Sequence, residues 1–256
     1  MSTNLSDYAW ECIHPILANN SNVRLTAGTR FFLSAWLWML RTGAQWRELP
    51  ERFGKWNSVY KRFARWSKLG VFDDVLEHLS RHADYEWLMV DSTTCRAHMS
   101  AAGAPASAGG QEAQSLGRSR GGFSTKIHIK TDALGLPVEV TLTPGQRGDM
   151  VGVWKLLEPE DSCAQYFLAD AAYDANRLRE RLKELEIEAV IPSNPSRSCE
   201  IPFDRDLYKA RHTIECFINK MKWFRRIATR YDKLDTSYLV HDAKQSVTRI
   251  RKRGYS

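Results

Sequence analysis

The sequence predicts an α/β protein in which a small all-helical region precedes a larger region built on a mixed β-sheet. Three observations predict this class. Apolar residues recur every three or four positions as far as residue 84. Beyond residue 84 they alternate, or form short runs between helical segments. The composition is also that of a globular chain, with 43% hydrophobic and 26% charged residues. We therefore expect two domains, residues 1–84 and 85–256.

The first region contains two helical patterns. Residues 26–40 carry apolar side chains at helical spacing, and Thr42-Gly43 marks the end of that helix. A second apolar face consists of Trp56, Val59, Tyr60, Phe63 and Trp66, and it is surrounded by Lys55, Lys61, Arg62, Arg65 and Lys68. Two helices joined through a turn, the second of them basic, are typical of a helix-turn-helix that reads a DNA groove. The alternative is a plain helical bundle, and for the tryptophans themselves we favour a place in its core.

The second region predicts strands and helices in an alternating order. A strand at 86–90 ends at Asp91, and residues 100–122, rich in Ala, Gly and Ser, are expected to form a mobile loop without regular elements. The remaining expected elements are a hairpin (123–131 and 137–143), a helix (149–157), a strand (166–169), a helix (174–185), a strand (188–191) and a long helix (206–222). This mixed order is what a ribonuclease H-like sheet requires.

Charge is distributed unevenly along the chain. Residues 1–85 hold 11 basic and 8 acidic residues, residues 86–206 hold 13 and 18, and residues 207–256 hold 13 and 4. A basic end beside an acidic middle suggests a polyanion such as nucleic acid as a partner, although a solvated basic helix has the same composition. The longest apolar run is far shorter than the roughly 20 residues of a membrane span, and no signal peptide is visible. Five cysteines without a CxxC pair fit a reduced, cytoplasmic chain and indicate no zinc site.

Three acidic residues stand where a metal site could form. Asp91 and Asp170 each follow an apolar strand, so their carboxylates converge if those strands are neighbours in one sheet. Glu215 lies within the basic helix. Carboxylate oxygens are ligands that Mg²⁺ prefers. Two such ions, about 3.5–4 Å apart, can hold the attacking and the leaving oxygen of a phosphodiester.

The helix around Glu215 places an acidic, two basic and one phenolic side chain on the same face. Tyr208, Arg211, Glu215 and Lys222 project into a sector of about 60° on a regular α-helix. Such a face can bind a metal and a phosphate together, with Arg211 as a fork and Lys222 as a point charge. The simpler interpretation is a solvated Arg211–Glu215 pair.

These motifs together resemble those of a DDE transposase of the insertion-sequence-five family. The similar segments, in chain order, are 40–50 with Trp56 and Arg65-Trp66, the stretch Val90-Asp-Ser-Thr93, residues 117–128, Pro144–Asp149, Leu168–Asp174, and Tyr208-(two)-Arg211-(three)-Glu215-(six)-Lys222. The last spacing fits the family's third motif without a gap. Because only 44 residues separate Asp170 from Glu215, we expect no β-rich insertion domain between them.

The resemblance implies a function and a set of residue roles. Asp91, Asp170 and Glu215 would be the catalytic metal ligands for two Mg²⁺ ions, for which Mn²⁺ could substitute. Tyr208, Arg211 and Lys222 would bind the DNA end, and the basic helix with Lys61, Arg62 and Arg65 would read the terminal inverted repeats. The enzyme would cut its element's ends and join the 3′-hydroxyl to target DNA, as a homodimer or larger assembly on DNA, in the bacterial cytoplasm at the nucleoid and without a membrane partner.

Other interpretations stay open at this point. A non-catalytic DNA-binding protein derived from a transposase, or a ribonuclease H-like nuclease that cuts without joining, would carry the same motifs. A phosphatase of the haloacid-dehalogenase type would need an aspartate at position 93, where Thr93 stands. His98 and His128 lie near the acidic motifs in the sequence and could assist protonation, although a packed or surface histidine is the simpler expectation.

Overall fold

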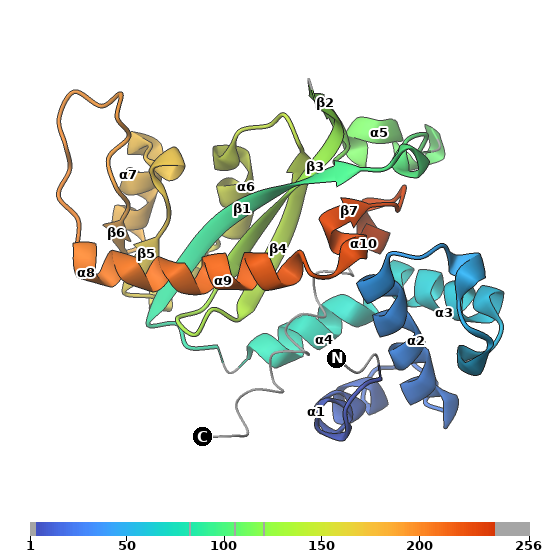
Figure 1. The fold of residues 1–256 in the computed structure, drawn as a ribbon. Helices are drawn as coiled ribbons and strands as arrows, with labels where there is room; N and C mark the ends of the chain where they lie inside the picture. Colours follow the sequence, from blue (N-terminus) through green and yellow to red (C-terminus); the bar gives the residue numbers. More distant parts are fainter. Residues whose placement is uncertain (1–3, 82, 105, 120, 239–256) are drawn as a thin grey trace.

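The computed structural model describes residues 4–81, 83–104, 106–119 and 121–238 (Figure 1). Residues 239–256, the last part of the basic C-terminal segment, lie outside these ranges. The N-terminal helical region consists of α1 (Asp7–Ala18), α2 (Gly28–Thr42), η1 (Trp46–Glu48), η2 (Glu51–Phe53), α3 (Trp56–Lys68) and α4 (Val71–Ser80). Within the described residues, no helix combines the length and the apolar character needed to cross a bilayer.

The aromatic residues of this region form its core. Trp36, Phe63 and Trp66 are buried together with Phe72. The expected core position is therefore confirmed for Trp66, whereas Trp56 is partly buried at the edge of the same core. Helix α2 ends at Gly43, whose φ of 66° is the left-handed conformation that glycine adopts without strain. The connection from α2 to α3 runs over residues 43–55 through η1 and η2. It is longer than the roughly 3–4-residue turn of the usual helix-turn-helix.

The second region is a mixed sheet, as predicted from the order of its elements. Its strands are β1 (Trp87–Ala97), β2 (Gly117–Ser119), β3 (Gly122–Thr131), β4 (Pro137–Pro144), β5 (Tyr166–Leu168), β6 (Glu188–Val190) and β7 (Thr229–Arg230). The order is β2-β3-β1-β5-β6, with β4 paired to β3 and β7 to β1. Strand β3 pairs antiparallel with β1, β2 and β4. Strand β5 pairs parallel with β1 and β6, and β7 also pairs parallel with β1.

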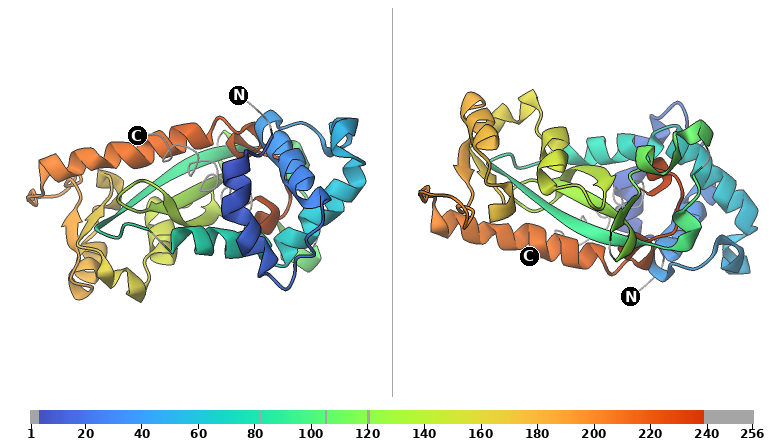
Figure 2. Two further views of the ribbon diagram at one scale, coloured as in Figure 1. Left: turned by 90° about the horizontal axis from the view of Figure 1, so that it is seen from below. Right: turned by 90° about the horizontal axis from the view of Figure 1, so that it is seen from above.

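Helices cover both faces of the sheet (Figure 2). One face packs against α6 (Asp149–Leu156) and α7 (Asn176–Glu184) through residues such as Leu88 and Val90 of β1. The other face packs against α9 (His212–Met221) through residues such as Met89 and Cys95. Successive side chains of a strand point to opposite faces. The odd-numbered residues of β1 therefore face α9, and the even-numbered ones face α6 and α7.

Three expectations about element boundaries were wrong. Strand β1 does not end at Asp91 but continues to Ala97, because residues 92–96 pair with β3. The segment 100–122 is not free of regular elements, since it contains η3 (Met99–Ala101), η4 (Ala106–Ala108), α5 (Gly110–Ala113) and β2. The expected helix 206–222 consists of α8 (Arg205–Tyr208), the 3-10 turn η7 (Lys209–Arg211) and α9.

Between Asp170 and Glu215 the chain is compact. Residues 171–214, all of them described, hold η6 (Ala171–Tyr173), α7, β6, α8, η7 and the start of α9. They contain no further sheet, in agreement with the expectation that no β-rich domain is inserted there.

The remaining elements are η5 (Pro159–Cys163), before β5, and α10 (Arg225–Ala228). Arg226 of α10 donates to the carbonyl of Ala44 at 3.0 Å and so ties the C-terminal part to the helical region.

Candidate active site on the sheet face covered by α9

Two neighbouring parallel strands bring Asp91 and Asp170 to one face of the sheet. Met89 of β1 is in register with Leu168 of β5, and both pack on the side of α9. Asp91 and Asp170 each lie two residues further along, and the backbone of Asp170 is still extended. Since side chains alternate, both carboxylates share the face of Met89 and Leu168. The structure thus brings together the two aspartates that the sequence singled out.

Arg211 connects Asp91 to Glu215. One terminal nitrogen of its guanidinium lies 2.8 Å from Asp91 Oδ2, and the other lies 2.7 Å from Glu215 Oε1. The Nε atom donates to the hydroxyl oxygen of Tyr208 at 3.3 Å. The sequence offered two interpretations of Arg211, a solvated pair with Glu215 and a role in a site. The Arg211–Glu215 pair exists, but the Arg211 side chain is only 14% exposed, and it also binds a strand carboxylate 120 positions away.

Burial and the charge of Arg211 shift the pKa of Asp91 in opposite directions. Partial burial raises the pKa of Asp91, and the nearby charge of Asp170 raises it further, while the Arg211 guanidinium and the Ser92 amide lower it. The net result is a raised pKa. Asp170 accepts a hydrogen bond from the amide of Ala172 at 2.9 Å and so begins the turn η6. Burying an acid beside a second acid is costly unless a cation is present, and Arg211 supplies that cation here.

Two further residues of the third motif lie at the outer ends of this segment, Tyr208 at the end of α8 and Lys222 at the C-cap of α9. Tyr208 is half-buried beneath the Arg211 side chain and packs edge-on against Phe203. Lys222 is exposed at the C-terminal end of α9 and, among the described residues, has no ion pair. Tyr208 therefore supports Arg211, whereas Lys222 presents its charge to the solvent.

The donor set fits a hard divalent cation in its chemistry. Three carboxylates come from β1, from the end of β5 and from α9, and they provide only oxygen ligands. In the conformation described for residues 4–238, however, no three Asp, Glu, His or Cys side chains of the described ranges are grouped to hold a metal ion. The reason is visible for two of them, because the Arg211 cation lies between Asp91 and Glu215.

The opposite face of the sheet carries a second polar group. The Ser92 hydroxyl and the Lys126 ammonium both donate to Asp149 Oδ1, and the Lys126 distance is 3.0 Å. Burial alone would raise the pKa of Asp149, but these two hydrogen bonds and the Lys126 charge lower it. Asp149 begins α6, so the bond to Ser92 holds α6 against the residue that follows Asp91.

The two histidines considered from the sequence lie away from the carboxylates. His128 is fully buried on β3, on the face of α6, and its Nε2 atom lies 2.8 Å from the hydroxyl of Thr143. Its ring touches the position that a side chain at Gly152 would occupy, so the glycine makes room for it. His98 is exposed and begins η3. The simpler expectation, a packed or surface histidine, is confirmed for both.

The basic helix α3 presents its cations unequally. Lys61 and Arg65 are exposed. Arg62 is half-buried, lies 4.8 Å from the ring centre of Phe32 and 4.9 Å from that of Trp66, and donates to the Thr29 hydroxyl at 2.7 Å. Lys61 and Arg65 are therefore free to meet a phosphate backbone, and Arg62 is committed to the aromatic core.

Comparison with known proteins identifies the family. Residues 82–239 match the transposase DDE domain, and residues 5–76 match the family described as "Putative transposase of IS4/5 family". The chain therefore belongs to the DDE transposases of the IS4/5 type, which confirms the resemblance found in the sequence. It is a transposase of an insertion sequence, an enzyme class that acts on DNA and generally uses divalent metal ions.

Two relatives match part of the chain. A protein of Brucella ovis, described as "Putative transposase for insertion sequence element IS6501", is 44% identical over 118 residues, which are 46% of this chain and 90% of the relative. The uncharacterized protein y4sN of Sinorhizobium fredii is 46% identical over 109 residues, which are 42% of this chain and 87% of the relative.

Proposed function

We propose that this transposase binds the terminal inverted repeats of its insertion sequence, cleaves the ends by phosphodiester hydrolysis and joins the freed 3′-hydroxyl to target DNA. The catalytic residues are Asp91, Asp170 and Glu215. The observation that carries the proposal is that Asp91 and Asp170 follow neighbouring parallel strands onto the face of α9, where Arg211 links Asp91 to Glu215.

The three carboxylates are the proposed ligands of two Mg²⁺ ions, which Mn²⁺ can replace. When bound, these ions polarise the attacking water or 3′-hydroxyl and stabilise the charge that develops on the phosphate. No covalent intermediate with the protein is required, and so no nucleophilic serine or tyrosine is assigned.

The chain's own cations have separate tasks in this proposal. Arg211 balances Asp91 and Glu215 in the free protein, and its two terminal nitrogens can form a fork with phosphate oxygens once the carboxylates have another partner. Tyr208 holds the Nε side of that guanidinium. Lys222 attracts the DNA end as an exposed point charge.

The fold and the domain division support the same function. We infer a ribonuclease H-like catalytic domain over residues 85–256, because the strand order and the two helix layers suit that fold. Residues 1–84 form the proposed DNA-binding domain, in which α3 reads the inverted repeats through Lys61 and Arg65. Two ends must be cut together, so the enzyme acts as a homodimer or larger assembly on transposon-end and target DNA, at the bacterial nucleoid.

A cleavage assay on end DNA tests the proposal. Asp91→Asn, Asp170→Asn and Glu215→Gln should each lower Mg²⁺-dependent cleavage by about 10³-fold, since the metal site contributes several kcal/mol to the transition state. Binding of the ends in a gel shift should persist. Asp206→Asn is a matched control, because Asp206 is an exposed acid of α8 paired with Lys209. Wild-type protein that binds ends but never cleaves them would favour the non-catalytic DNA-binding protein. Cleavage without a strand-transfer product would favour a nuclease.

A further inference from the structure

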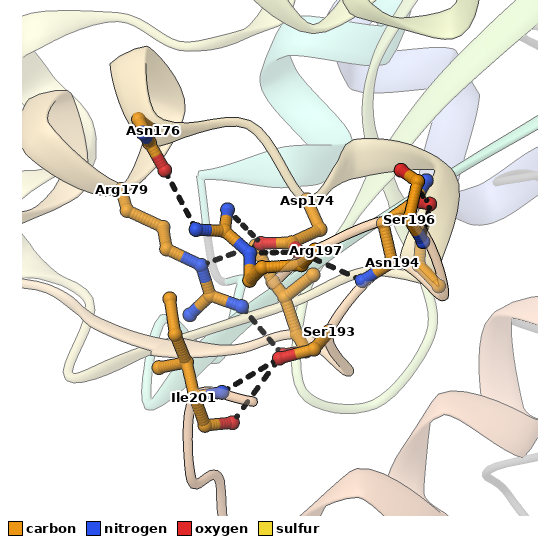
Figure 3. A network of polar contacts seen from close by, with 10 residues as sticks. Asp174, Asn176, Arg179, Ser193, Asn194, Ser196, Arg197 and Ile201 are labelled. Atoms are coloured by element: carbon orange, nitrogen blue, oxygen red, sulfur yellow. Dashed lines mark hydrogen bonds and ion pairs between the residues drawn. The ribbon is translucent and has the colours of Figure 1, made fainter. Parts of the chain in front are cut away.

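Asp174 is a fully buried carboxylate that the reaction does not use. Its side chain is 0% exposed. It accepts hydrogen bonds from Arg179 Nε at 2.7 Å, from Arg197 Nε at 2.7 Å and a terminal Arg197 nitrogen at 2.9 Å, and from the Asn194 amide at 2.7 Å (Figure 3). Asp174, Arg179, Asn194 and Arg197 are called the Asp174 clamp below.

The clamp joins three segments at the carboxyl ends of β5 and β6. Asp174 follows the turn that Asp170 begins, and Arg179 extends from α7 to the carbonyl of Ile191 at 2.8 Å. Asn194 and Arg197 belong to the connection 192–204, which leads into α8 and then to Glu215. The clamp therefore links the segment that follows Asp170 directly to the segment that leads to Glu215.

Besides the clamp, the connection 192–204 is held by Phe203, which packs edge-on against Tyr208, and by the Asn194 side chain, which donates to the Ala171 carbonyl at 3.5 Å. It contains no helix or strand, and most of its residues are exposed or half-buried. Arg197 extends the clamp on its far side, where it donates to the side chain of Asn176 at 2.8 Å. The side chain of Ser193 bonds the amide of Ile201 at 2.7 Å and closes the connection on itself.

The clamp is saturated, and so it is not a free binding site for phosphate. Both arginines are engaged with Asp174, and each donates in addition to a carbonyl or an amide oxygen. Arg197 bonds both carboxylate oxygens, a two-pronged geometry that fixes direction as well as distance. A geometry of this kind suits a residue that sets the position of two segments.

We propose that Arg197 is a positioning residue, which through its two-pronged bond to Asp174 sets the spacing between Asp170 and the helix that carries Glu215. This inference rests on the proposed metal site. Outer contacts that orient metal ligands typically change metal affinity by about 10–100-fold. Because Arg197 acts through the backbone of two ligand-bearing segments, we expect an effect at the lower end, about tenfold.

The test is binding of Mn²⁺ alone to the full-length protein, measured by electron paramagnetic resonance of the free ion. Arg197→Lys keeps the charge but cannot donate to both oxygens of Asp174 in the same plane, and it should weaken Mn²⁺ binding about tenfold. Arg205→Lys is the matched control, since Arg205 begins α8 directly after the connection and, among the described residues, its one ion pair is with the exposed Glu200 at 4.0 Å. Its Mn²⁺ affinity should stay within twofold of wild type.

Further variants separate positioning from a loss of folding. Asp174→Asn should weaken Mn²⁺ binding to a similar degree, and combining it with Arg197→Lys should add little, because both remove one link. Asn176→Ala removes only the outermost bond of Arg197, at an exposed residue, and should still weaken binding two- to threefold if Arg197→Lys does not fold. Wild-type Mn²⁺ affinity in a folded Arg197→Lys or in Asn176→Ala overturns the inference. If the wild-type protein binds no Mn²⁺, or if Glu215→Gln does not abolish that binding, the proposed metal site is wrong instead.

Discussion

Arg211 and Asp91 are 120 positions apart in the chain, and the guanidinium of the first lies 2.8 Å from the carboxylate of the second. The same guanidinium binds Glu215. In the free protein, an internal cation therefore stands between two of the three acids that we assign to the metal ions. In the proposed metal site, divalent cations would compete with Arg211 for the same oxygens, and this competition leads to the first prediction.

Arg211→Gln should bind Mn²⁺ about tenfold more tightly than wild type while cleaving end DNA more slowly. Two unit charges about 4 Å apart repel by ~4 kcal/mol at an effective dielectric constant of 20, and Mn²⁺ carries twice the unit charge, so tenfold is a modest expectation. The measurement is Mn²⁺ binding to the free protein at pH 8. Weaker Mn²⁺ binding by this variant would mean that Arg211 organises the carboxylates rather than competing for them.

Lys222→Ala should weaken binding of the DNA end and reduce its salt dependence by about one counterion, a change of about 0.9 in the slope of log K against log salt concentration. The physical reason is that Lys222 is exposed at the end of α9 and lacks an ion pair within the described ranges. Lys209→Ala is the control, because Lys209 is already paired with Asp206 at 2.6 Å. An unchanged slope for Lys222→Ala would remove this residue from the phosphate contacts.

The three cations of α3 should separate into two groups. Arg62→Ala should lower the free energy of unfolding by about 1–2 kcal/mol, since the guanidinium loses two aromatic faces and the bond to Thr29. Lys61→Ala and Arg65→Ala should leave stability within about 0.5 kcal/mol and weaken protection of the inverted repeats. Urea unfolding and footprinting measure the two effects. Intact footprints with Lys61→Ala and Arg65→Ala would show that α3 does not read the repeats.

His128 should make the fold less stable in mild acid. Burial lowers the pKa of His128 from 6.5 to about 4. Between pH 6.5 and pH 4, His128 is protonated in the unfolded chain but stays neutral in the folded one. The free energy of unfolding is therefore highest above pH 6.5 and falls as the pH decreases toward 4. The slope is at most about 1.4 kcal/mol per pH unit. Urea unfolding measures the free energy of unfolding at pH 5 and at pH 7. The difference between these two free energies should be smaller for His128→Gln than for wild type, and it should equal that of wild type for His98→Gln, a change at an exposed residue.

Much of the fold could be predicted because it depends on local patterns. The alternation of Ile127 and Ile129 predicts β3, and the aromatic stripe around Phe63 predicts the helical core. The end of β1 could not be read in this way. Beyond Asp91 the strand continues with Ser92, Thr93 and Thr94, which are not apolar, and it is pairing with β3 that keeps these residues extended.

The candidate site residues could be singled out from the sequence, but their arrangement could not be predicted. Spacing places Arg211 and Glu215 on one helix face, but it does not indicate that Arg211 also binds Asp91 on another element. Asp174 belongs to the second acidic motif, and this position could have marked it as a candidate for a structural or functional role. Arg197 lies in a segment rich in Ser, Pro and Asn, where no periodicity marks a buried partner. Such long-range ion pairs depend on the tertiary fold.

Transposition in cells tests the central claim most directly, that Asp91, Asp170 and Glu215 form one catalytic site. A marker flanked by the DNA that borders the gene would be supplied on one plasmid, and wild-type protein, Glu215→Gln or Asp206→Asn from another. We predict insertions with short target duplications for wild type and Asp206→Asn and none for Glu215→Gln, at equal protein levels. Insertions at the wild-type frequency with Glu215→Gln would contradict the account.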